Sequence, residues 1–385
     1  MKKIIKMITF LLMAFSLISC MDDDPVKARQ SAVKRLYKHG TAKIAIANSF
    51  EDNPTMMWEG ALLAQEKING GNFCPVKFEL VKCEDGGTKI SGTKKAYEIA
   101  SDPEIFAVIG HGYSDISLPC SLIYQYYGIL TFNFISTIHS LTDRKNPLIF
   151  SNMPNDYDFG DKIAEICEKN GYRRVLIYYL ENTSGTSLSN AFEMSCNNRG
   201  IEVVERDSYD ISTPAQTFDR MAKRWKNTFA FDALFLAGRM PSIKDIIFAL
   251  RENEIDCPVL GADPFDDPLL VESLDESENG RIFSVSNYNP SSKNIQFNEF
   301  RNAFVEKYGK EPDQEALQVY DALFVLAKAI NESWTTVPSE LAEVLRRELW
   351  YEAAGPYTFH ANGAIKDREL TKKVFKDGSF EEFDF

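Results

Sequence analysis

The stretch IFAVIGHGYSD, residues 105–115, decides the fold class. Its first five residues are all apolar, as in a β-strand that is buried on both faces. Two glycines then flank His111, and Ser114 stands just before a run with helical apolar spacing, 116–127. A buried strand that passes through a glycine loop into a helix is the repeating unit of a parallel α/β sheet.

The same alternation of strands and helices extends in both directions from this stretch. Before Pro147 the predicted strands are 43–47, 76–83, 105–109 and 129–132, separated by helices 55–69, 91–101 and 116–127. After Pro147 the predicted strands are 148–151, 175–179, 202–207, 233–236 and 259–260, separated by helices 157–170, 186–199, 215–226 and 243–252. From Arg281 one strand, 281–287, is followed by helices 295–308, 314–332 and 338–348 and a hairpin-like tail from Gly355. Two such runs predict two doubly wound parallel sheets, which bind ligands at the carboxyl ends of their strands.

Length and charge narrow the class of protein. The chain has 385 residues, 44% of them hydrophobic, which is enough for two globular domains. Its net charge of −13 opposes binding to nucleic acid, because such binding depends on Lys and Arg that neutralise phosphates. The same acid excess argues against adhesion to anionic lipid through a broad basic face.

The N-terminus predicts export. Three lysines precede an apolar run, Ile8–Ile18, which is too short to span a bilayer but has the length of a signal-peptide core. The run ends in Leu17-Ile18-Ser19-Cys20, which resembles the bacterial lipoprotein box, where cleavage before the cysteine leaves Cys20 lipid-modified. We therefore expect a lipoprotein signal peptide at 1–19, an acidic tether at 20–41, and a lipid-anchored protein facing the periplasm or the cell surface. The alternative is an ordinary secretory signal with a chance cysteine.

Six further cysteines would lie in an oxidising compartment, which permits disulfides. If two of them pair, Cys167 and Cys196 are our first candidates, because they lie on successive predicted helices. Buried free thiols are the alternative. The sequence contains neither a CxxC pair nor clustered histidines, so we expect no metal site.

Enzyme and cofactor motifs are missing or incomplete. Gly110-His111-Gly112 begins like a dinucleotide fingerprint, but its third glycine position holds Asp115, whose carboxylate would oppose a pyrophosphate. No GxSxG, HExxH or P-loop is present, so we expect neither catalysis nor a cofactor. A glycine loop with Ser114 at a helix start instead suits a small anion such as a carboxylate. In the alternative interpretation, Ser114 only caps its helix.

An ordered set of motifs carries a family resemblance. From about Lys43 onward the chain resembles the type I periplasmic binding proteins, of the leucine/isoleucine/valine-binding and receptor ligand-binding type. The motifs that match are Gly60-Ala61 with Glu66–Gly71, Ala107–Ser114, Gly128–Thr137 with Leu141-Thr142, Gly261-Ala262-Asp263, Tyr320-Asp321-Ala322 and Gly355–Phe359.

This resemblance implies two lobes joined by a hinge of three crossovers, with ligand bound between them. The crossovers are expected near Ser151, Asn287 and Gly355. Lobe 1 would then comprise 41–150 with 288–353, and lobe 2 would comprise 151–287 with 354–385.

The resemblance also implies roles for individual residues. Ser114 and the N–H of Thr137 would bind the carboxylate of an amino acid. The Ile135 carbonyl, the Thr137 hydroxyl and Asp263 would bind its ammonium. Arg239 replaces a tyrosine that usually faces the ligand, and we hypothesise that it pairs with an anionic group, because a guanidinium grips carboxylates bidentately. Tyr113 could supply an aromatic wall.

The function expected from these features is capture of a small polar metabolite, most simply an amino acid or a related zwitterion, for an ABC permease. A ligand sensor or a non-transport accessory lipoprotein on the same scaffold are alternatives, and an envelope enzyme is a weaker one. Ligand identity is not encoded in any motif that we find.

Overall fold

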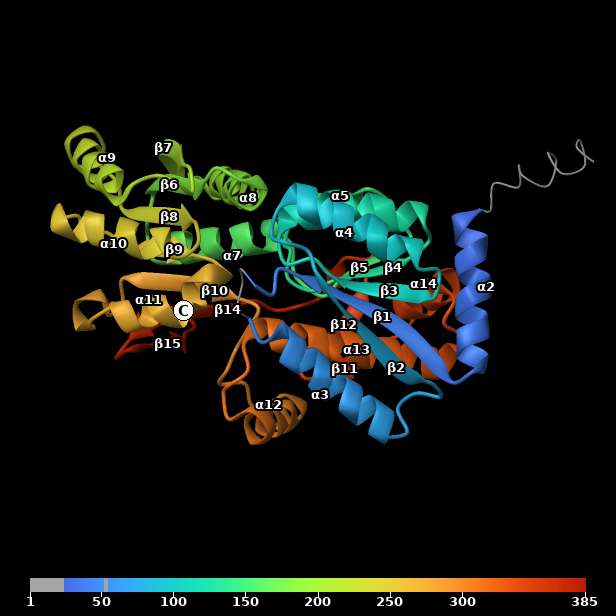
Figure 1. The fold of residues 1–385 in the computed structure, drawn as a ribbon. Helices are drawn as coiled ribbons and strands as arrows, with labels where there is room; N and C mark the ends of the chain where they lie inside the picture. The colour runs from blue at the N-terminus through green and yellow to red at the C-terminus, as the bar shows by residue number, and fades with distance from the viewer. Residues whose placement is uncertain (1–23, 52–54) are drawn as a thin grey trace, which may run out of the picture.

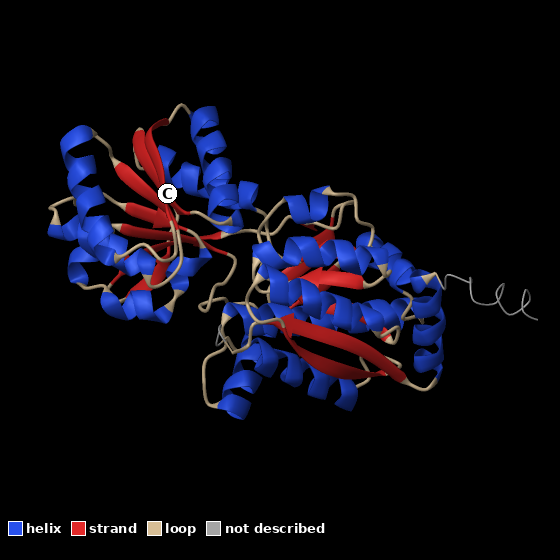
Figure 2. Ribbon diagram, turned by 45° about the horizontal axis from the view of Figure 1, so that its top comes forward, coloured by secondary structure: helices blue, strands red, loops and turns tan. Residues whose placement is uncertain are grey.

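The computed structural model describes residues 24–51 and 55–385, and Cys20 with the predicted signal peptide lies outside them. The described chain forms two α/β lobes side by side, each built around its own sheet (Figures 1 and 2). The prediction of two doubly wound lobes is therefore confirmed. None of the described helices combines the length and apolarity that a membrane span requires.

Lobe 1 contains a five-stranded parallel sheet of order β2-β1-β3-β4-β5. The strands are β1 (Thr41–Asn48), β2 (Lys77–Glu84), β3 (Ile105–Gly110), β4 (Leu130–Asn133) and β5 (Ile149–Ser151). All six residues of β3 are buried, as its unbroken apolar sequence predicts for a central parallel strand.

Helices cover both faces of this sheet and create two cores. The larger core lies under α3 (Met57–Gly70), α12 (Ile295–Tyr308), α13 (Gln314–Ser333) and α14 (Pro338–Arg347). Gly60 of α3 is necessary here, because a Cβ at that position would lie 2.4 Å from the carbonyl oxygen of Ala316 in α13. The smaller core lies under α4 (Lys89–Ser101) and α5 (Ser114–Tyr126).

Lobe 2 contains a seven-stranded sheet of order β15-β14-β10-β9-β8-β6-β7. Five strands are parallel, namely β6 (Arg174–Leu180), β7 (Glu202–Tyr209), β8 (Ala233–Ala237), β9 (Val259–Gly261) and β10 (Ile282–Ser286). The other two, β14 (Thr371–Lys376) and β15 (Ser379–Glu382), add antiparallel at one edge. The helices on the two faces are α7 (Asp156–Lys169) and α8 (Thr183–Arg199) on one side, and α9 (Ala215–Thr228) and α10 (Ser242–Glu252) on the other.

The third crossing between the lobes differs from the expectation. A small antiparallel sheet of β11 (Trp350–Glu352), β12 (Gly355–Phe359) and β13 (Ile365–Lys366) packs into the larger core of lobe 1 through Tyr357, Phe359 and Ile365. The chain returns to lobe 2 only between β13 and β14. Residues 354–366 therefore belong to lobe 1, and the crossover expected near Gly355 lies more than ten residues later in the chain. The reason is aromatic packing: the Phe359 ring of β12 contacts Phe132 of β4 and Phe150 of β5.

The segment expected to be a tether is also different. Within residues 20–41, Pro25–Lys38 forms helix α2, which begins at an Asp24 cap. Its inner face packs on lobe 1 through Ala32 and Val33. Buried Arg29 fixes the helix further, donating hydrogen bonds to backbone carbonyls at Ala100, Asp102, Ile105 and Tyr127. Burial lowers the pKa of Arg29 to about 10.

The proposed Cys167–Cys196 disulfide is wrong. All six cysteines in the described part of the chain are free, and Cys167 and Cys196 are buried. They lie in the core between α7 and α8, where apolar neighbours favour the neutral thiol, and burial raises the pKa of Cys167 to about 12. The alternative of buried free thiols therefore holds for this pair.

Candidate functional site

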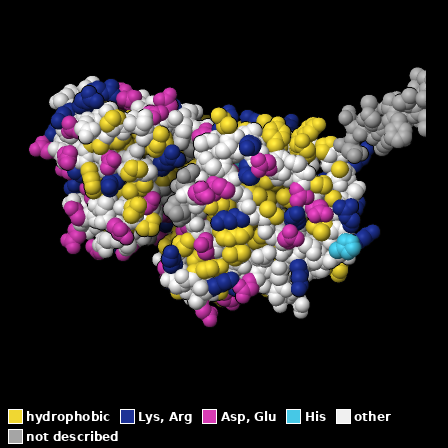
Figure 3. Space-filling view, viewed as in Figure 1, with side chains coloured by type: hydrophobic (Ala, Val, Ile, Leu, Met, Phe, Trp, Pro, Cys, Tyr) yellow, Lys and Arg dark blue, Asp and Glu magenta, His cyan; other side chains and the backbone are white. Residues whose placement is uncertain are grey.

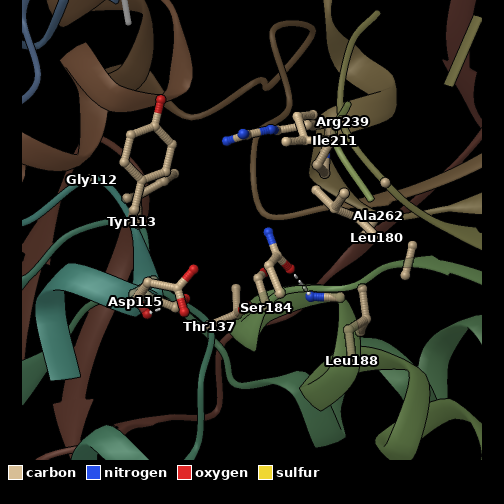
Figure 4. Close-up of a pocket in the computed structure, with 18 of the residues that line it drawn as sticks. Gly112, Tyr113, Asp115, Thr137, Leu180, Ser184, Leu188, Ile211, Arg239 and Ala262 are labelled. Atoms are coloured by element: carbon tan, nitrogen blue, oxygen red, sulfur yellow. Dashed lines mark hydrogen bonds between the residues drawn. The ribbon is translucent and has the colours of Figure 1, made fainter. Parts of the chain in front are cut away.

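A cavity of about 540 Å³ lies between the lobes, where the carboxyl ends of strands from both sheets meet. Its lobe 1 wall comes from the loops that follow β2, β3 and β4. Its lobe 2 wall comes from the ends of β6, β7, β8 and β9. All six residues predicted for ligand binding line this one cavity: Tyr113, Ser114, Ile135, Thr137, Arg239 and Asp263. Figure 4 labels Tyr113, Thr137 and Arg239 among them.

Ser114 reaches the cavity because the preceding loop fits tightly against β1. A Cβ on Gly112 would lie 2.1 Å from the side-chain oxygen of buried Asn48, so a larger residue there would displace that side chain. Ser114 is the first residue of α5, and Tyr113 occupies the cap position without a side-chain cap bond. The interpretation of Ser114 as a cap is therefore wrong. Its hydroxyl oxygen lies 2.8 Å from that of Ser136, in the neighbouring cavity loop.

The loop after β4 is held rigidly by Asn133. The Asn133 side chain donates to the Ser136 carbonyl at 2.6 Å and accepts from the Ser136 N–H at 3.0 Å. These two hydrogen bonds fix Ser136, and its neighbours Ile135 and Thr137 line the cavity on either side of it. The Thr137 hydroxyl donates to Asp156, the first residue of α7, at 2.6 Å, and its lone pairs remain able to accept from a ligand.

Asp263 lies where lobe 2 meets the hinge. It follows β9, and its carboxylate accepts from the N–H of Asn287 at 3.0 Å and from the Gln314 side chain at 3.4 Å. Burial, followed by the nearby charge of Asp266, raises the pKa of Asp263 to about 6. A cation placed beside Asp263 would relieve this cost and favour the ionised carboxylate.

Two contacts join the lobes across the cavity. The Arg239 guanidinium carbon lies 5.7 Å from the centre of the Tyr113 ring, and Figure 4 shows the side chain extending from lobe 2 toward that ring. The Thr183 hydroxyl, at the start of α8, donates to Asp115 at the start of α5. Each pair takes one residue from each lobe, so both contacts bridge the cavity.

Sequence reasoning missed the apolar wall of the cavity. Five side chains from lobe 2 form this wall: Phe159, Leu180, Leu188, Ile211 and Leu236. Figure 4 shows Leu180, Leu188 and Ile211 on the side opposite Asp115 and Thr137. No polar motif marks these positions, since each looks like an ordinary core residue. The carboxylates of Asp115 and Asp156 also line the cavity and were not predicted for it.

A buried hydrogen-bonded group supports the Ser114 loop from behind. His111 lies between Asp85, 2.6 Å from Nδ1, and the Tyr124 hydroxyl, 2.9 Å from Nε2. Asp85 also accepts from the N–H of Gly87, a residue that lines the cavity. The group therefore joins two cavity loops to the core and does not itself line the cavity.

The arrangement can bind a small molecule that carries both charges. Hydroxyl groups and a helix start line the cavity together with the carboxylates of Asp115, Asp156 and Asp263, and an apolar wall completes it. Among residues 24–51 and 55–385, no three His, Cys, Asp or Glu side chains gather as a metal site would require.

Comparisons with known proteins agree with this geometry. The sequence profile of the family described as periplasmic binding protein matches residues 49–372. The Leu/Ile/Val-binding protein of Escherichia coli is 26% identical over 316 residues, which cover 81% of this chain and 83% of that protein. An amino acid binding protein of Pseudomonas aeruginosa is 22% identical over 317 residues, covering 80% of this chain and 82% of that protein. A solved ABC transporter substrate-binding protein from Desulfitobacterium hafniense, in complex with Leu, superposes with a TM-score of 0.78 at 29% identity, over 89% of this chain and 100% of that one.

Proposed function

The chain belongs to the periplasmic binding proteins, and we propose that it captures a small α-amino acid, or a related zwitterion, between its lobes for an ABC transporter. The relatives named above are binding proteins, two of them for amino acids and one for an ABC transporter. Our proposal transfers that role to this chain on the basis of its own cavity.

One observation carries the proposal: Ser114, Thr137 and Asp263 come from three separate loops and line a single cavity. A zwitterion is costly to bury unless both of its charges find partners. Ser114 and the N–H of Thr137 would receive the carboxylate at the start of α5. The Thr137 hydroxyl, the Ile135 carbonyl and Asp263 would receive the ammonium.

The remaining space sets the side-chain preference. Leu180, Leu188 and Ile211 offer an aliphatic wall, so an aliphatic side chain would bury its surface there. The guanidinium of Arg239 also lines this space and lies beside the Tyr113 ring. It would pair with a second anionic group on a ligand that carries one.

The sequence motif at Cys20 adds a location to this proposal. We take the protein to be lipid-anchored in the bacterial envelope, on the basis of Leu17–Cys20, and to pass its ligand to a permease. In the alternative role, as a ligand sensor, the protein would bind its ligand in the same cavity.

Mass spectrometry of the small molecules that co-purify with the protein tests the proposal, followed by calorimetry with amino acids that have aliphatic, acidic and basic side chains. We expect micromolar or tighter binding of at least one amino acid. Ser114→Ala should weaken that binding at least tenfold, whereas Ser339→Ala, on the exposed side of α14, should not. Binding of only nucleotides or sugars would refute the amino-acid assignment.

A further inference from the structure

Helix α2 presents a continuous basic face to solvent. Its exposed residues recur at intervals of three and four along the helix: Lys27, Ala28, Ser31, Lys34, Arg35 and Lys38. No acidic residue occurs within Pro25–Lys38, although the whole chain has a net charge of −13. We call these six residues the basic face of α2. It departs from the expectation that this acidic chain lacks such a face.

The basic face cannot turn inward, because the opposite face of α2 is fixed to lobe 1. Arg29, Ala32 and Val33 are buried there, and Thr336 donates to the Val33 carbonyl at 3.1 Å. Figure 1 shows α2 across the end of lobe 1 that lies farthest from lobe 2. The basic face therefore forms that end of the molecule.

Three of the four cations on this face have an acid beside them. Lys27 lies 3.7 Å from Asp24, Lys34 lies 3.8 Å from Glu340, and Arg35 lies 3.5 Å from Glu104. These separations are long and all the side chains are exposed, so each pair is weak and easily exchanged for another anion. Lys38 makes no ion pair with any described residue.

An exposed aromatic residue adjoins the first turn of α2. Tyr126, at the end of α5, is 68% exposed, and Leu122 one turn earlier is 46% exposed. The chain just after α5 contacts α2 here, since the Arg29 side chain donates to the Tyr127 carbonyl at 2.9 Å. Figure 3 shows hydrophobic side chains along the edge formed by α5 and Lys and Arg side chains at the end formed by α2. Tyrosine beside basic residues suits the boundary between lipid headgroups and water.

From this surface we infer that the basic face of α2, with Tyr126 beside it, rests on an anionic phospholipid membrane. The inference depends on the proposed acylation of Cys20. Four residues from Cys20 to Asp24 reach at most about 14 Å, so an acylated Cys20 would hold the start of α2 within that distance of the headgroups. Charge complementarity then turns the basic face toward the bilayer and lobe 2 away from it.

Lysine acetylation of the full-length acylated protein tests this orientation. The protein is reconstituted in vesicles of phosphatidylglycerol and phosphatidylethanolamine, or of phosphatidylcholine alone, and labelling is followed by mass spectrometry. We expect at least fivefold slower labelling of Lys27, Lys34 and Lys38 on the anionic vesicles only. Lys223 of α9, whose side chain is 60% exposed in lobe 2, is the internal control and should label equally on both.

Charge reversal provides the matched variant. Lys34→Glu with Arg35→Glu should abolish the protection of Lys27 and Lys38, whereas Lys223→Glu with Arg220→Glu on lobe 2 should not, and ligand affinity should be unchanged in both.

Equal labelling on both vesicle types, with an acylated Cys20 and normal ligand binding, would overturn the inference and leave the proposed function intact. An unmodified Cys20 would also overturn it. Protection that rises with protein concentration in the absence of vesicles would assign the face to self-association instead.

Discussion

The guanidinium carbon of Arg239, in lobe 2, lies 5.7 Å from the centre of the Tyr113 ring, in lobe 1. A cation over an aromatic face is attracted by the ring quadrupole, so this contact links the lobes beside the cavity. It also keeps a fixed positive charge beside the space where a ligand's side chain would lie.

Arg239→Ala should therefore change ligand preference. We expect affinity for amino acids with an acidic side chain to fall at least tenfold, and affinity for aliphatic ones to change less than threefold, because only the former would pair with the guanidinium. Calorimetry with glutamate and leucine measures both. Arg220→Ala, on the exposed side of α9, is the matched control, and equal losses for both ligands would contradict the assigned role.

Removal of the Thr183–Asp115 hydrogen bond should destabilise the closed arrangement. Thr183→Val should lower ligand affinity by roughly three- to tenfold, mainly through faster dissociation, because the bond forms only when α5 and α8 meet. Stopped-flow kinetics and small-angle scattering report the two effects. Because Asp115 also lines the cavity, the coupling is measured by scattering from the unliganded protein: Asp115→Asn in the Thr183→Val background should add little opening, and full additivity of the two substitutions would argue against a direct coupling.

Ligand affinity should depend on pH through Asp263. The pKa of Asp263 is raised to about 6, so this carboxyl is largely protonated at pH 5 and ionised at pH 7. An ammonium favours the ionised form, so the affinity should fall about tenfold between pH 7 and pH 5, with release of a proton on binding at the lower pH. Calorimetry in buffers of different ionisation enthalpy measures that proton. Asp263→Asn should bind weakly with a flat profile.

The raised pKa of Asp263 affects the stability of the unliganded protein in the opposite direction: stability, unlike ligand affinity, falls as pH rises. A carboxyl whose folded pKa lies above its unfolded value binds more protons when folded, so its contribution to stability is greatest at low pH and is lost as pH rises through about 6. Asp321, also buried with a pKa raised to about 6, acts in the same direction. Denaturation of the apo protein should therefore show Asp263→Asn gaining stability relative to the parent at pH 8 and not at pH 4.

Arg29→Ala should destabilise lobe 1 by about 3 kcal/mol. The buried guanidinium donates to four backbone carbonyls, and its removal takes a hydrogen-bond donor from each of them. Urea denaturation measures the loss. Arg35→Ala, on the exposed face of the same helix, should cost less than about 0.5 kcal/mol, and a similar cost for both would contradict the role given to Arg29.

Reductant should leave the melting temperature unchanged. The six cysteines in the described part of the chain are free, and Cys167 and Cys196 lie in an apolar core where burial raises their pKa. Thiol titration of the denatured protein should find all six. A lower melting temperature in dithiothreitol would indicate a disulfide and contradict this structure.

The lobe 1 half of the site was predictable because its signals are local. The Gly110–Ser114 loop follows a short apolar strand, and parallel strands bring their carboxyl ends to one edge. The roles of Ile135 and Thr137, after the next strand, came from the family resemblance. The local signals for α2 were present as well, since Asp24 and Pro25 form a helix start, but the acids around them favoured a tether.

The amino-acid order alone determined the parallel strands of the two sheets and the glycine loop that carries Ser114, because strand burial, glycine loops and helix starts depend on neighbours a few residues away. Thr137 and Asp263 were placed in the site by the resemblance to a known family. The tertiary structure decided the rest: the apolar wall at Leu180, Leu188 and Ile211, the Arg239–Tyr113 contact, and the late return of the chain after β13. Those features depend on which surfaces meet when two lobes close. The contact between the lobes depends on packing and charge between segments far apart in the chain, so it cannot be predicted from any short stretch of residues.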